Sequence, residues 1–213
     1  MKITKFGHSC LLVEEGGARI LIDPGDYADI PHELPNIDVV LITHEHKDHF
    51  SIDALKNVLE NNPGVIILTH NSVARILDNE SIVCEIINDG DVYVVKNTTI
   101  KSFGVEHACI HSDLPKIQNT GFLVAGRFFH PGDSFFVPPE KVEILALPVA
   151  GPWMKISEAV DYAKFVMPSI VVPIHDGMLR QDRMAPTRLI PEKLLGAEGI
   201  RYVDMGEGDI REF

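Results

Sequence analysis

The residues best suited to chemistry lie in one segment, LITHEHKDHFS, which runs from Leu41 to Ser51. Four side chains that bind metals fall within six positions of it: His44, His46, Asp48 and His49. Buried together, imidazole and carboxylate groups would stay unsatisfied, whereas a divalent cation accepts both as ligands. The spacing lets His44 and His46 point toward one metal ion while Asp48 and His49 bind at a second position. The segment therefore predicts two neighbouring metal ions.

The elements on either side of this segment must position it. The apolar stretch at residues 37–43 predicts a buried central strand. Residues 51–62 begin with a serine and carry Ile52, Leu55 and Leu59 on one face, which predicts a capped helix. A buried strand cannot carry four polar groups in a row, so we expect the metal-binding side chains in the loop between them.

Further short apolar stretches predict a chain richer in strands than in helices. The predicted strands are residues 1–6, 10–15, 18–23, 65–70, 92–97, 98–105, 120–125, 127–130, 142–148 and 169–175. Residues 156–167 and 188–197 have the pattern of helices. Because no low-complexity linker divides the chain, we expect a single domain over residues 1–213.

The two halves of the chain repeat one order of elements. A hairpin leads into DPGD at residues 23–26 and, in the second half, into HPGD at residues 130–133. Each motif precedes an apolar strand, a helix, and a proline that opens a strand ending in histidine, at Pro63–His70 and Pro168–His175. This predicts an α/β (α+β) protein with two pseudo-symmetric halves, stacked as a four-layer αββα sandwich. We expect the site where the halves meet.

The charge of the chain narrows its partners. A formal net charge of −12 argues against a broad electrostatic grip on nucleic acid, so we expect no such partner. A small anionic substrate stays compatible, because a bound metal adds positive charge. The one basic cluster, Arg180, Arg183 and Arg188, is either a solvated face or the rim of a site for an anionic group.

Apolar runs and cysteines bear on the compartment. No run approaches the roughly 20 residues that span a bilayer, so we expect no membrane partner. The start, MKITKFGHSC, lacks the apolar region of a signal peptide. Cys10, Cys84 and Cys109 form no C-x-x-C pair, which predicts reduced, mostly buried thiols and no cysteine-based metal site. We therefore expect a cytoplasmic protein.

A family resemblance rests on the histidine-rich segment. HEHKDH matches the H-x-H-x-D-H motif of the metallo-β-lactamase superfamily, and later stations follow in VEHACIH, HPGDS and VPIH. FGHSCLLVE, LIDPG and LPVAGPW resemble small single-domain members related to ascorbate-6-phosphate lactonases. The resemblance covers nearly the whole chain. It implies the αββα sandwich of that family, in agreement with the repeated halves.

The resemblance implies ligands for two divalent ions. The first ion is held by His44, His46 and His107. The second is held by Asp48, His49 and His175, and Asp133 bridges both ions. His111 rivals His107, which we prefer because the residues before it have the pattern of a strand running to the site. We expect zinc first, with manganese, iron or nickel as alternatives.

The chemistry of such a centre is hydrolysis. Two ions about 3.5–4 Å apart share a water and lower its pKa from about 15.7 toward about 7. The resulting bridging hydroxide attacks a carbonyl or phosphoryl centre. Asp48 would also orient the hydroxide, and the resemblance gives His8 a site-facing or substrate role. No Ser-His-Asp or Cys-His arrangement is evident.

Other residues near the predicted site have two interpretations each. Asp23 either hydrogen-bonds a metal-bound histidine or shapes the turn before Pro-Gly. His130 can cap a strand, and Lys47 is expected in solvent. Trp153 and Lys155 either line the mouth of the site or, for the single tryptophan, pack in the core.

We thus expect a dinuclear metal hydrolase acting on a small ester, first an anionic lactone. A phosphodiesterase of the same fold is the alternative. From another class, a non-hydrolytic metal-binding or redox di-iron protein is the competitor, but its relatives carry H-x-E-x-D-H where this chain has His46. A secreted β-lactamase needs a signal peptide, and a glyoxalase II needs a further helical domain. An RNA-processing member needs a basic surface and an inserted domain. We expect none of these in this sequence.

Overall fold

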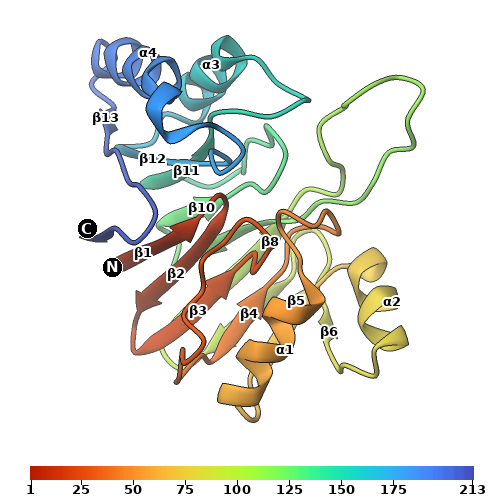
Figure 1. Cartoon of the computed structure of the whole chain (residues 1–213). Coiled ribbons are helices and arrows are strands. Elements are labelled where there is room, and N and C mark those ends of the chain that lie inside the picture. The colour runs from red at the N-terminus through yellow and green to blue at the C-terminus, as the bar shows by residue number, and fades with distance from the viewer.

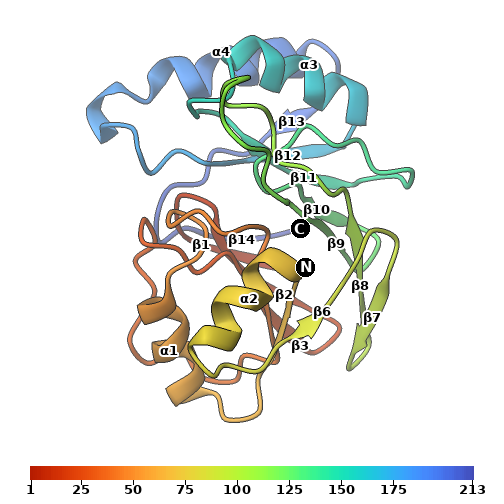
Figure 2. The ribbon, with the colours of Figure 1, turned by 90° about the vertical axis from the view of Figure 1, so that its right-hand side faces the viewer.

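Two sheets lie face to face in the computed structural model, and helices cover the outer side of each (Figures 1 and 2). The structure describes the backbone of residues 1–213 and every side chain except that of Gln181. The helices are α1 (Ile52–Asn61), α2 (Asn71–Asn79), α3 (Ile156–Val166) and α4 (Ala185–Gly196), with a short 3-10 turn η1 (Gln181–Arg183). The first two pack on one sheet and the last two on the other, so the predicted four-layer αββα sandwich is confirmed.

The first sheet has the order β14-β1-β2-β3-β4-β5-β6. Its strands are β1 (Lys2–Gly7), β2 (Cys10–Glu15), β3 (Ala18–Ile22), β4 (Val39–Leu41), β5 (Ile66–Thr69), β6 (Glu85–Ile86) and β14 (Ile210–Glu212). The second sheet has the order β13-β12-β11-β10-β9-β8-β7. Its strands are β7 (Val92–Val95), β8 (Thr98–Phe103), β9 (Gly121–Val124), β10 (Phe128–His130), β11 (Ile144–Pro148), β12 (Ile170–Ile174) and β13 (Arg201–Tyr202).

The two sheets share one connectivity. In the first, β1, β2 and β3 are antiparallel neighbours and β3 to β6 run parallel. In the second, β8, β9 and β10 are antiparallel and β10 to β13 run parallel. Helix α1 connects β4 to β5, as α3 connects β11 to β12. Helix α2 connects β5 to β6, as α4 connects β12 to β13. The seventh strand corresponds in position but not in connection, because β14 comes from the end of the chain to pair with β1, whereas β7 directly precedes its partner β8. The predicted pseudo-symmetric halves are confirmed.

Alternating side chains of each sheet serve two different cores. In β4, Val39 and Leu41 face the second sheet, whereas Val40 packs toward α1 and α2. In β11, Ile144 faces the first sheet and Leu145 packs toward α3 and α4. This is the period of two that a strand imposes. Each buried aliphatic side chain contributes about 1.5–3 kcal/mol, so three apolar layers hold the four layers together.

Besides the short turn η1, four elements were not predicted from the sequence. Helix α2 begins after His70, whose ring accepts a hydrogen bond from the backbone of Ser72, and histidine is not a residue that signals a helix start. Strands β6, β13 and β14 have two or three residues, too few to show an alternating pattern. Helix α4 begins at Ala185, before the predicted residue 188, because Pro186 fits the first helical turn.

One buried ion pair connects the two halves. Lys5 of β1 has 1% of its surface exposed. Its Nζ donates hydrogen bonds to both carboxylate oxygens of Asp176 at 2.8 Å and to the carbonyl of Pro173 at 2.9 Å. Burial lowers the pKa of Lys5, and Asp176 opposes that shift. The first strand is thereby fixed to the turn that follows β12.

Two other expectations bear on the surface. Of the cysteines, Cys10 is buried but Cys109 is exposed, so the prediction of mostly buried thiols is wrong for the latter, which lies in a long loop. Among the helices described, none is long and apolar enough to cross a membrane.

Candidate metal centre

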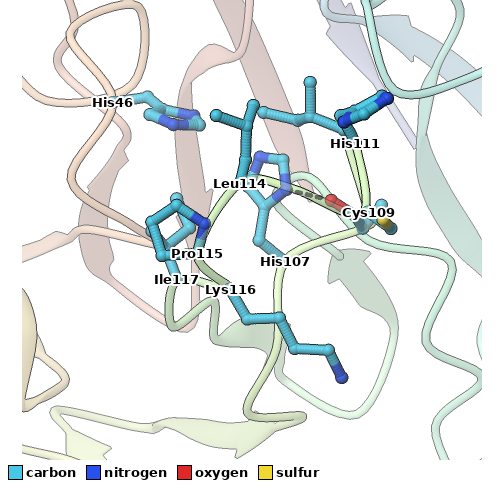
Figure 3. Close-up of a pocket in the computed structure, with 10 residues that line it drawn as sticks. His46, His107, Cys109, His111, Leu114, Pro115, Lys116 and Ile117 are labelled. Carbon is cyan, nitrogen blue, oxygen red and sulfur yellow. Dashed lines mark hydrogen bonds between the residues drawn. The ribbon is translucent and has the colours of Figure 1, made fainter.

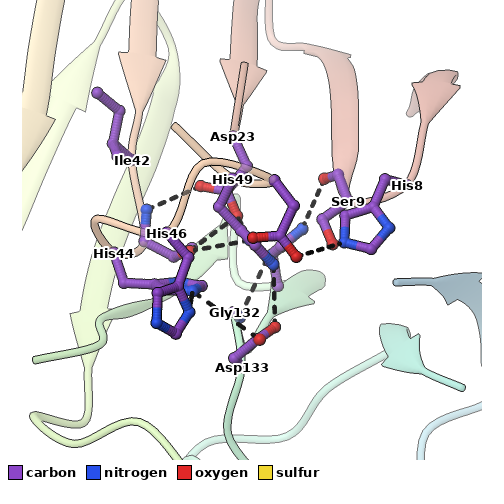
Figure 4. Close-up of polar contacts among 12 residues, drawn as sticks. His8, Ser9, Asp23, Ile42, His44, His46, His49, Gly132 and Asp133 are labelled. Atoms are coloured by element: carbon purple, nitrogen blue, oxygen red, sulfur yellow. Dashed lines mark hydrogen bonds and ion pairs between the residues drawn. The ribbon is translucent and has the colours of Figure 1, made fainter. Parts of the chain in front are cut away.

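Loops at the facing edges of the two sheets bring all the predicted ligands together. The loop after β4 carries His44, His46, Asp48 and His49, and the segments after β8, β10 and β12 carry His107, Asp133 and His175. Figure 4 shows how the histidines of the first loop, Asp23, His8 and Asp133 converge. The strand ends place these residues, as expected for a site between two sheets.

The side chains form two groups of potential ligands. The first group is His44, His46, His107 and Asp133. The second group is His8, Asp48, His49 and His175. In each group one ligand atom per residue lies within 4.8 Å of all the others. Two features differ from the predicted sets: His8 joins the second group, and Asp133 is grouped with the first alone.

Asp133 lies between the two groups. Its Oδ1 is 3.0 Å from Nε2 of His49. Its Oδ2 is 3.0 Å from Nε2 of His175 and 3.3 Å from Nε2 of His107. The carboxylate thus contacts histidines of both groups, which is the position that a bridging ligand needs.

Three of the histidines are held through Nδ1. Nδ1 of His49 lies 2.7 Å from Oδ2 of Asp23, and Nδ1 of His107 lies 2.5 Å from the carbonyl of Ala108. Both acceptors require a proton on Nδ1, which leaves the lone pair on Nε2. Nδ1 of His44 is 3.0 Å from the hydroxyl of Thr43. That hydroxyl donates to Asp23, so it accepts from His44 and frees Nε2 there as well.

Asp23 organises this support. It is fully buried and accepts hydrogen bonds from the backbone and the hydroxyl of Thr43, both at 2.8 Å, besides that from His49. Its φ of +50° places it in the left-handed region, which costs a non-glycine residue about 1–3 kcal/mol. The carboxylate therefore fixes the end of β4 and the ring of a potential ligand together.

Buried atoms without hydrogen bonds test whether a cation fits. Nε2 of His49, Nε2 of His107 and Oδ1 of Asp133 are buried, and none has a hydrogen-bond partner among the described residues. His49 and Asp133 approach to 3.0 Å, but not in hydrogen-bonding geometry. Unpaired buried groups cost about 1–3 kcal/mol each. A divalent cation accepts both atom types as ligands, so this donor set fits metal ions.

The pKa shifts describe the same centre without metal. Burial opposes the charged form of His49, yet the carboxylates of Asp133 and Asp23 raise its pKa well above the ordinary value. Burial likewise opposes the charge of Asp133, but His49 and His175 hold its pKa well below the ordinary value. Burial, with His49 adding, lowers the pKa of His44. The carboxylates thus attract one positive charge into the site, which a bound cation would supply.

His8 has the opposite tautomer. Its Nδ1 accepts a hydrogen bond from the backbone of Gly177 at 3.0 Å, so the neutral ring carries its proton on Nε2. That Nε2 lies 3.1 Å from Oδ2 of Asp48 and donates to it. Burial lowers the pKa of His8 to about 4, which keeps the ring neutral. His8 is therefore a hydrogen-bond donor in this arrangement rather than a free lone pair.

Trp153 is more closely tied to the centre than the sequence indicated. Its indole nitrogen donates a hydrogen bond to Oδ2 of Asp133 at 2.8 Å. Its ring lies 6.0 Å from that of His107 and 5.8 Å from that of His175, centroid to centroid. A Cβ on Gly151 would come within 2.9 Å of the indole nitrogen. The GPW motif after β11 was the only signal in the sequence.

The remaining candidates belong to neither group. His111 is exposed, and its Nδ1 accepts from the backbone of Asp113. His130 is buried, with Nε2 3.0 Å from the carbonyl of Ser9, so it joins two turns. Lys47 and Lys155 are exposed. The basic cluster is paired with acids: Arg180 and Arg183 with Asp182, and Arg188 with Asp204.

The glycines of the two PGD motifs have a shared physical reason. A Cβ on Gly25 would lie 2.1 Å from the carbonyl oxygen of Asp48. A Cβ on Gly132 would lie 2.2 Å from Oδ1 of Asn119. Only glycine allows these close approaches, so each half uses it to bring its loop against the centre.

Known proteins resemble this chain over most of its length. Residues 2–175 match the family described as "Beta-lactamase superfamily domain". Protein Rv0786c of Mycobacterium tuberculosis (strain ATCC 25618 / H37Rv) is 40% identical over 187 residues, 85% of this chain and 87% of that protein. A UPF0173 metal-dependent hydrolase of Methanosphaera stadtmanae is 29% identical over 198 residues, 82% of this chain and 83% of that protein. Igni18, a metallo hydrolase from Ignicoccus hospitalis KIN4/I, shares the fold, with a TM-score of 0.76 at 23% identity over 100% of this chain and 98% of that one.

Proposed function

We propose that this chain uses two divalent ions to hydrolyse a small ester, with a lactone as the first candidate substrate. The premise is that the chain belongs to the β-lactamase superfamily and is a metal-dependent hydrolase. The observation that carries the proposal is the position of Asp133, whose two oxygens contact histidines of both groups. One ion in each group, with Asp133 shared, would satisfy Nε2 of His49, Nε2 of His107 and Oδ1 of Asp133, which are buried without hydrogen-bond partners. Histidine and aspartate ligands suit zinc first, with manganese, iron or nickel as alternatives.

The chain supplies positioning around such ions. When bound, they lower the pKa of a water molecule and polarise an oxygen of the substrate. Asp48, whose pKa is lowered to about 2 despite burial because His8 and His49 stabilise its charge, accepts a hydrogen bond from the attacking water. His8 holds Asp48 in place by donating a hydrogen bond from Nε2. Trp153 fixes the orientation of Asp133.

A substrate panel tests the proposal. The purified chain, reconstituted with zinc or manganese, is given lactones, aryl esters and bis-aryl phosphodiesters, with bound metal measured in parallel. We expect turnover of an ester and about two metal ions per chain. Asp133→Ala should lose bound metal and at least about 10³-fold in kcat/KM, because metal ions contribute several kcal/mol to transition-state stabilisation.

His111→Ala is the matched control for that variant. His111 is an exposed histidine outside both groups, so metal content should not change. Phosphodiester turnover without ester turnover would move the protein to the alternative substrate class. Full metal content and activity in Asp133→Ala would refute the shared position.

A further inference from the structure

A cavity of about 220 Å³ opens beside the first group of ligands. Its walls come from one loop, residues 108–117, together with His46 and His107. Figure 3 shows Leu114 between the rings of His46 and His111, above His107. Two potential metal ligands therefore form one wall, and the other walls, which include Cys109 and His111, belong to neither ligand group.

The loop that forms the cavity is largely apolar. Ala108, Ile110, Leu114, Pro115 and Ile117 contribute to its walls. Ile110 and Leu114 are 38% and 53% exposed, although both are large aliphatic side chains. Single exposed apolar residues need no explanation, but a group of them beside a catalytic centre indicates a binding surface.

Among the described residues that line this cavity, there is one lysine and no arginine. Lys116 is its only lysine or arginine, and its Nζ is 2.7 Å from Oε2 of Glu106. Figure 3 shows the Lys116 side chain pointing away from His46. The loop thus offers an anionic group no unpaired lysine or arginine, and its apolar walls favour an uncharged substituent.

The base of the loop is fixed to the centre while its tip stands apart. The amide of His107 donates to the carbonyl of Ile117 at 3.0 Å, and that of Ala108 donates to the carbonyl of Asp133 at 2.8 Å. Ala108 thereby fixes the cavity to the residue between the two groups. The two ends of the cavity-forming loop, at Ala108 and Ile117, consequently have a defined place beside the candidate centre.

We infer that this cavity is the subsite for an uncharged, apolar substituent of the substrate, which makes the preferred substrates alkyl- or aryl-substituted lactones and esters. The inference rests on the proposed ester hydrolysis and replaces the anionic substrate expected from the sequence. An empty cavity of about 150 Å³ holds benzene, so 220 Å³ accepts one ring or a short alkyl chain. The ester itself would lie outside the cavity, beside His46 and His107.

A series of γ-lactones tests the subsite through chain length. The side chain is lengthened from none to six carbons, and a phosphorylated sugar lactone is included. We expect kcat/KM to rise about fourfold per added methylene until the cavity is full, because each buried methylene contributes that factor. The phosphorylated lactone should be the poorer substrate. A flat series, or a preference for the phosphorylated lactone, would overturn the inference.

Two variants localise the effect. Leu114→Asn should reduce the gain in kcat/KM per methylene. The kcat/KM values of the shortest and the longest lactone should therefore differ less than in the wild type. Leu189→Asn changes a leucine of α4 that is 60% exposed, and it should keep the full dependence on chain length. Equal slopes in both variants would place the apolar subsite elsewhere.

Binding of hexanamide separates this inference from the proposed function. The amide is uncharged and resists hydrolysis, so its binding is observed by amide chemical shifts whether or not the protein cleaves esters. Shifts at Ile110 and Leu114 that Leu114→Asn weakens support the subsite even if no ester is hydrolysed. Ester hydrolysis with no shift in residues 108–117 would retain the function and reject the subsite.

Discussion

His70 follows β5 in the first half as His175 follows β12 in the second, and the two strands occupy the same place in their sheets. Nδ1 of His70 accepts from the backbone of Ser72, and Nε2 lies 3.0 Å from the carbonyl of Thr43. His175 instead has a φ of +63° and reaches Asp133 at 3.0 Å. The same topological position is structural in one half and part of the centre in the other.

Corresponding loops of the two halves also differ in the potential ligands that they carry. The segment after β4 carries four potential ligands, whereas the corresponding segment after β11 offers Trp153. Between the first two strands of the repeat, the first half has a tight turn with His8, and the second half has the long loop with His107 and the cavity. Shared connectivity therefore delivers loops to a common edge, and local sequence decides what each loop does.

The largest expected effect, on metal affinity, comes from replacing with alanine the histidines that follow β5 and β12, His70 and His175. His175→Ala should cost more than the roughly 100-fold in metal affinity that loss of a supporting residue costs. His70→Ala removes a helix cap and should lower the free energy of unfolding by about 0.5–2 kcal/mol with metal affinity retained. Calorimetric zinc titration and urea unfolding distinguish them. Equal loss of metal in both variants would break the comparison.

The connection between the halves gives the next effect. Lys5→Met leaves the buried Asp176 without its partner and should lower the free energy of unfolding by about 3–5 kcal/mol. Lys5→Met/Asp176→Leu removes both charges and should recover most of that loss. Urea unfolding of the three proteins measures this. If the single variant unfolds at the wild-type midpoint, the pair does not hold the halves together.

A pH experiment examines the tight turn of the first half. In the metal-free protein, burial lowers the pKa of His8 to about 4, while an unfolded histidine titrates near 6.5. Between about pH 6.5 and pH 4, His8 is therefore protonated in the unfolded chain but neutral in the folded chain. The stability contributed by neutral His8 is complete above about pH 6.5 and is lost as the pH falls toward about 4.

His8→Gln makes that prediction measurable. The loss of unfolding free energy between pH 7 and pH 4 should be smaller in the variant, by on the order of 3 kcal/mol. Urea unfolding with a chelator present gives both curves. Other groups titrate in the same range, but they are common to both proteins. Parallel curves would show that His8 titrates alike in the folded and unfolded chains.

The smallest expected effect concerns the first residues of the two PGD motifs. Asp23→Asn weakens the support of His49 and should reduce metal affinity about 10–100-fold. His130→Asn changes the corresponding residue of the second half, which contacts the Ser9 carbonyl rather than a potential ligand, so metal affinity should change little. Competition with a chromogenic chelator compares them. A larger effect at His130 would reverse the assignment of support to Asp23.

Sequence and structure agree best where the signal is local. The alternating or continuous apolar runs predicted the main strands, and the four potential ligands of the first loop were predicted from six consecutive residues. His107, Asp133 and His175 were placed by the family resemblance, because their approach depends on strand ends far apart in the chain. Helix α2 was missed, since a histidine cap gives no recognised start.

Long-range polar pairs could not be predicted at all. Lys5 is one residue of an ordinary strand pattern, and nothing near it indicates Asp176, 171 positions away. Trp153 likewise has no local feature that points to Asp133. Such pairs form because the fold excludes water around them, and that burial is a property of the completed packing.

The order in which the chain is synthesised gives the buried Lys5 a further consequence. The ligands after β4 leave the ribosome early, but Asp176, the partner of Lys5, follows His175 directly. Strand β1 also pairs with β14, with Lys2 opposite Glu212. Contacts this distant in sequence form late, because closing long loops costs entropy before the contacts repay it. A nascent chain would then hold a partial set of the potential ligands for most of its synthesis, and metal binding at the proposed centre would follow the end of folding.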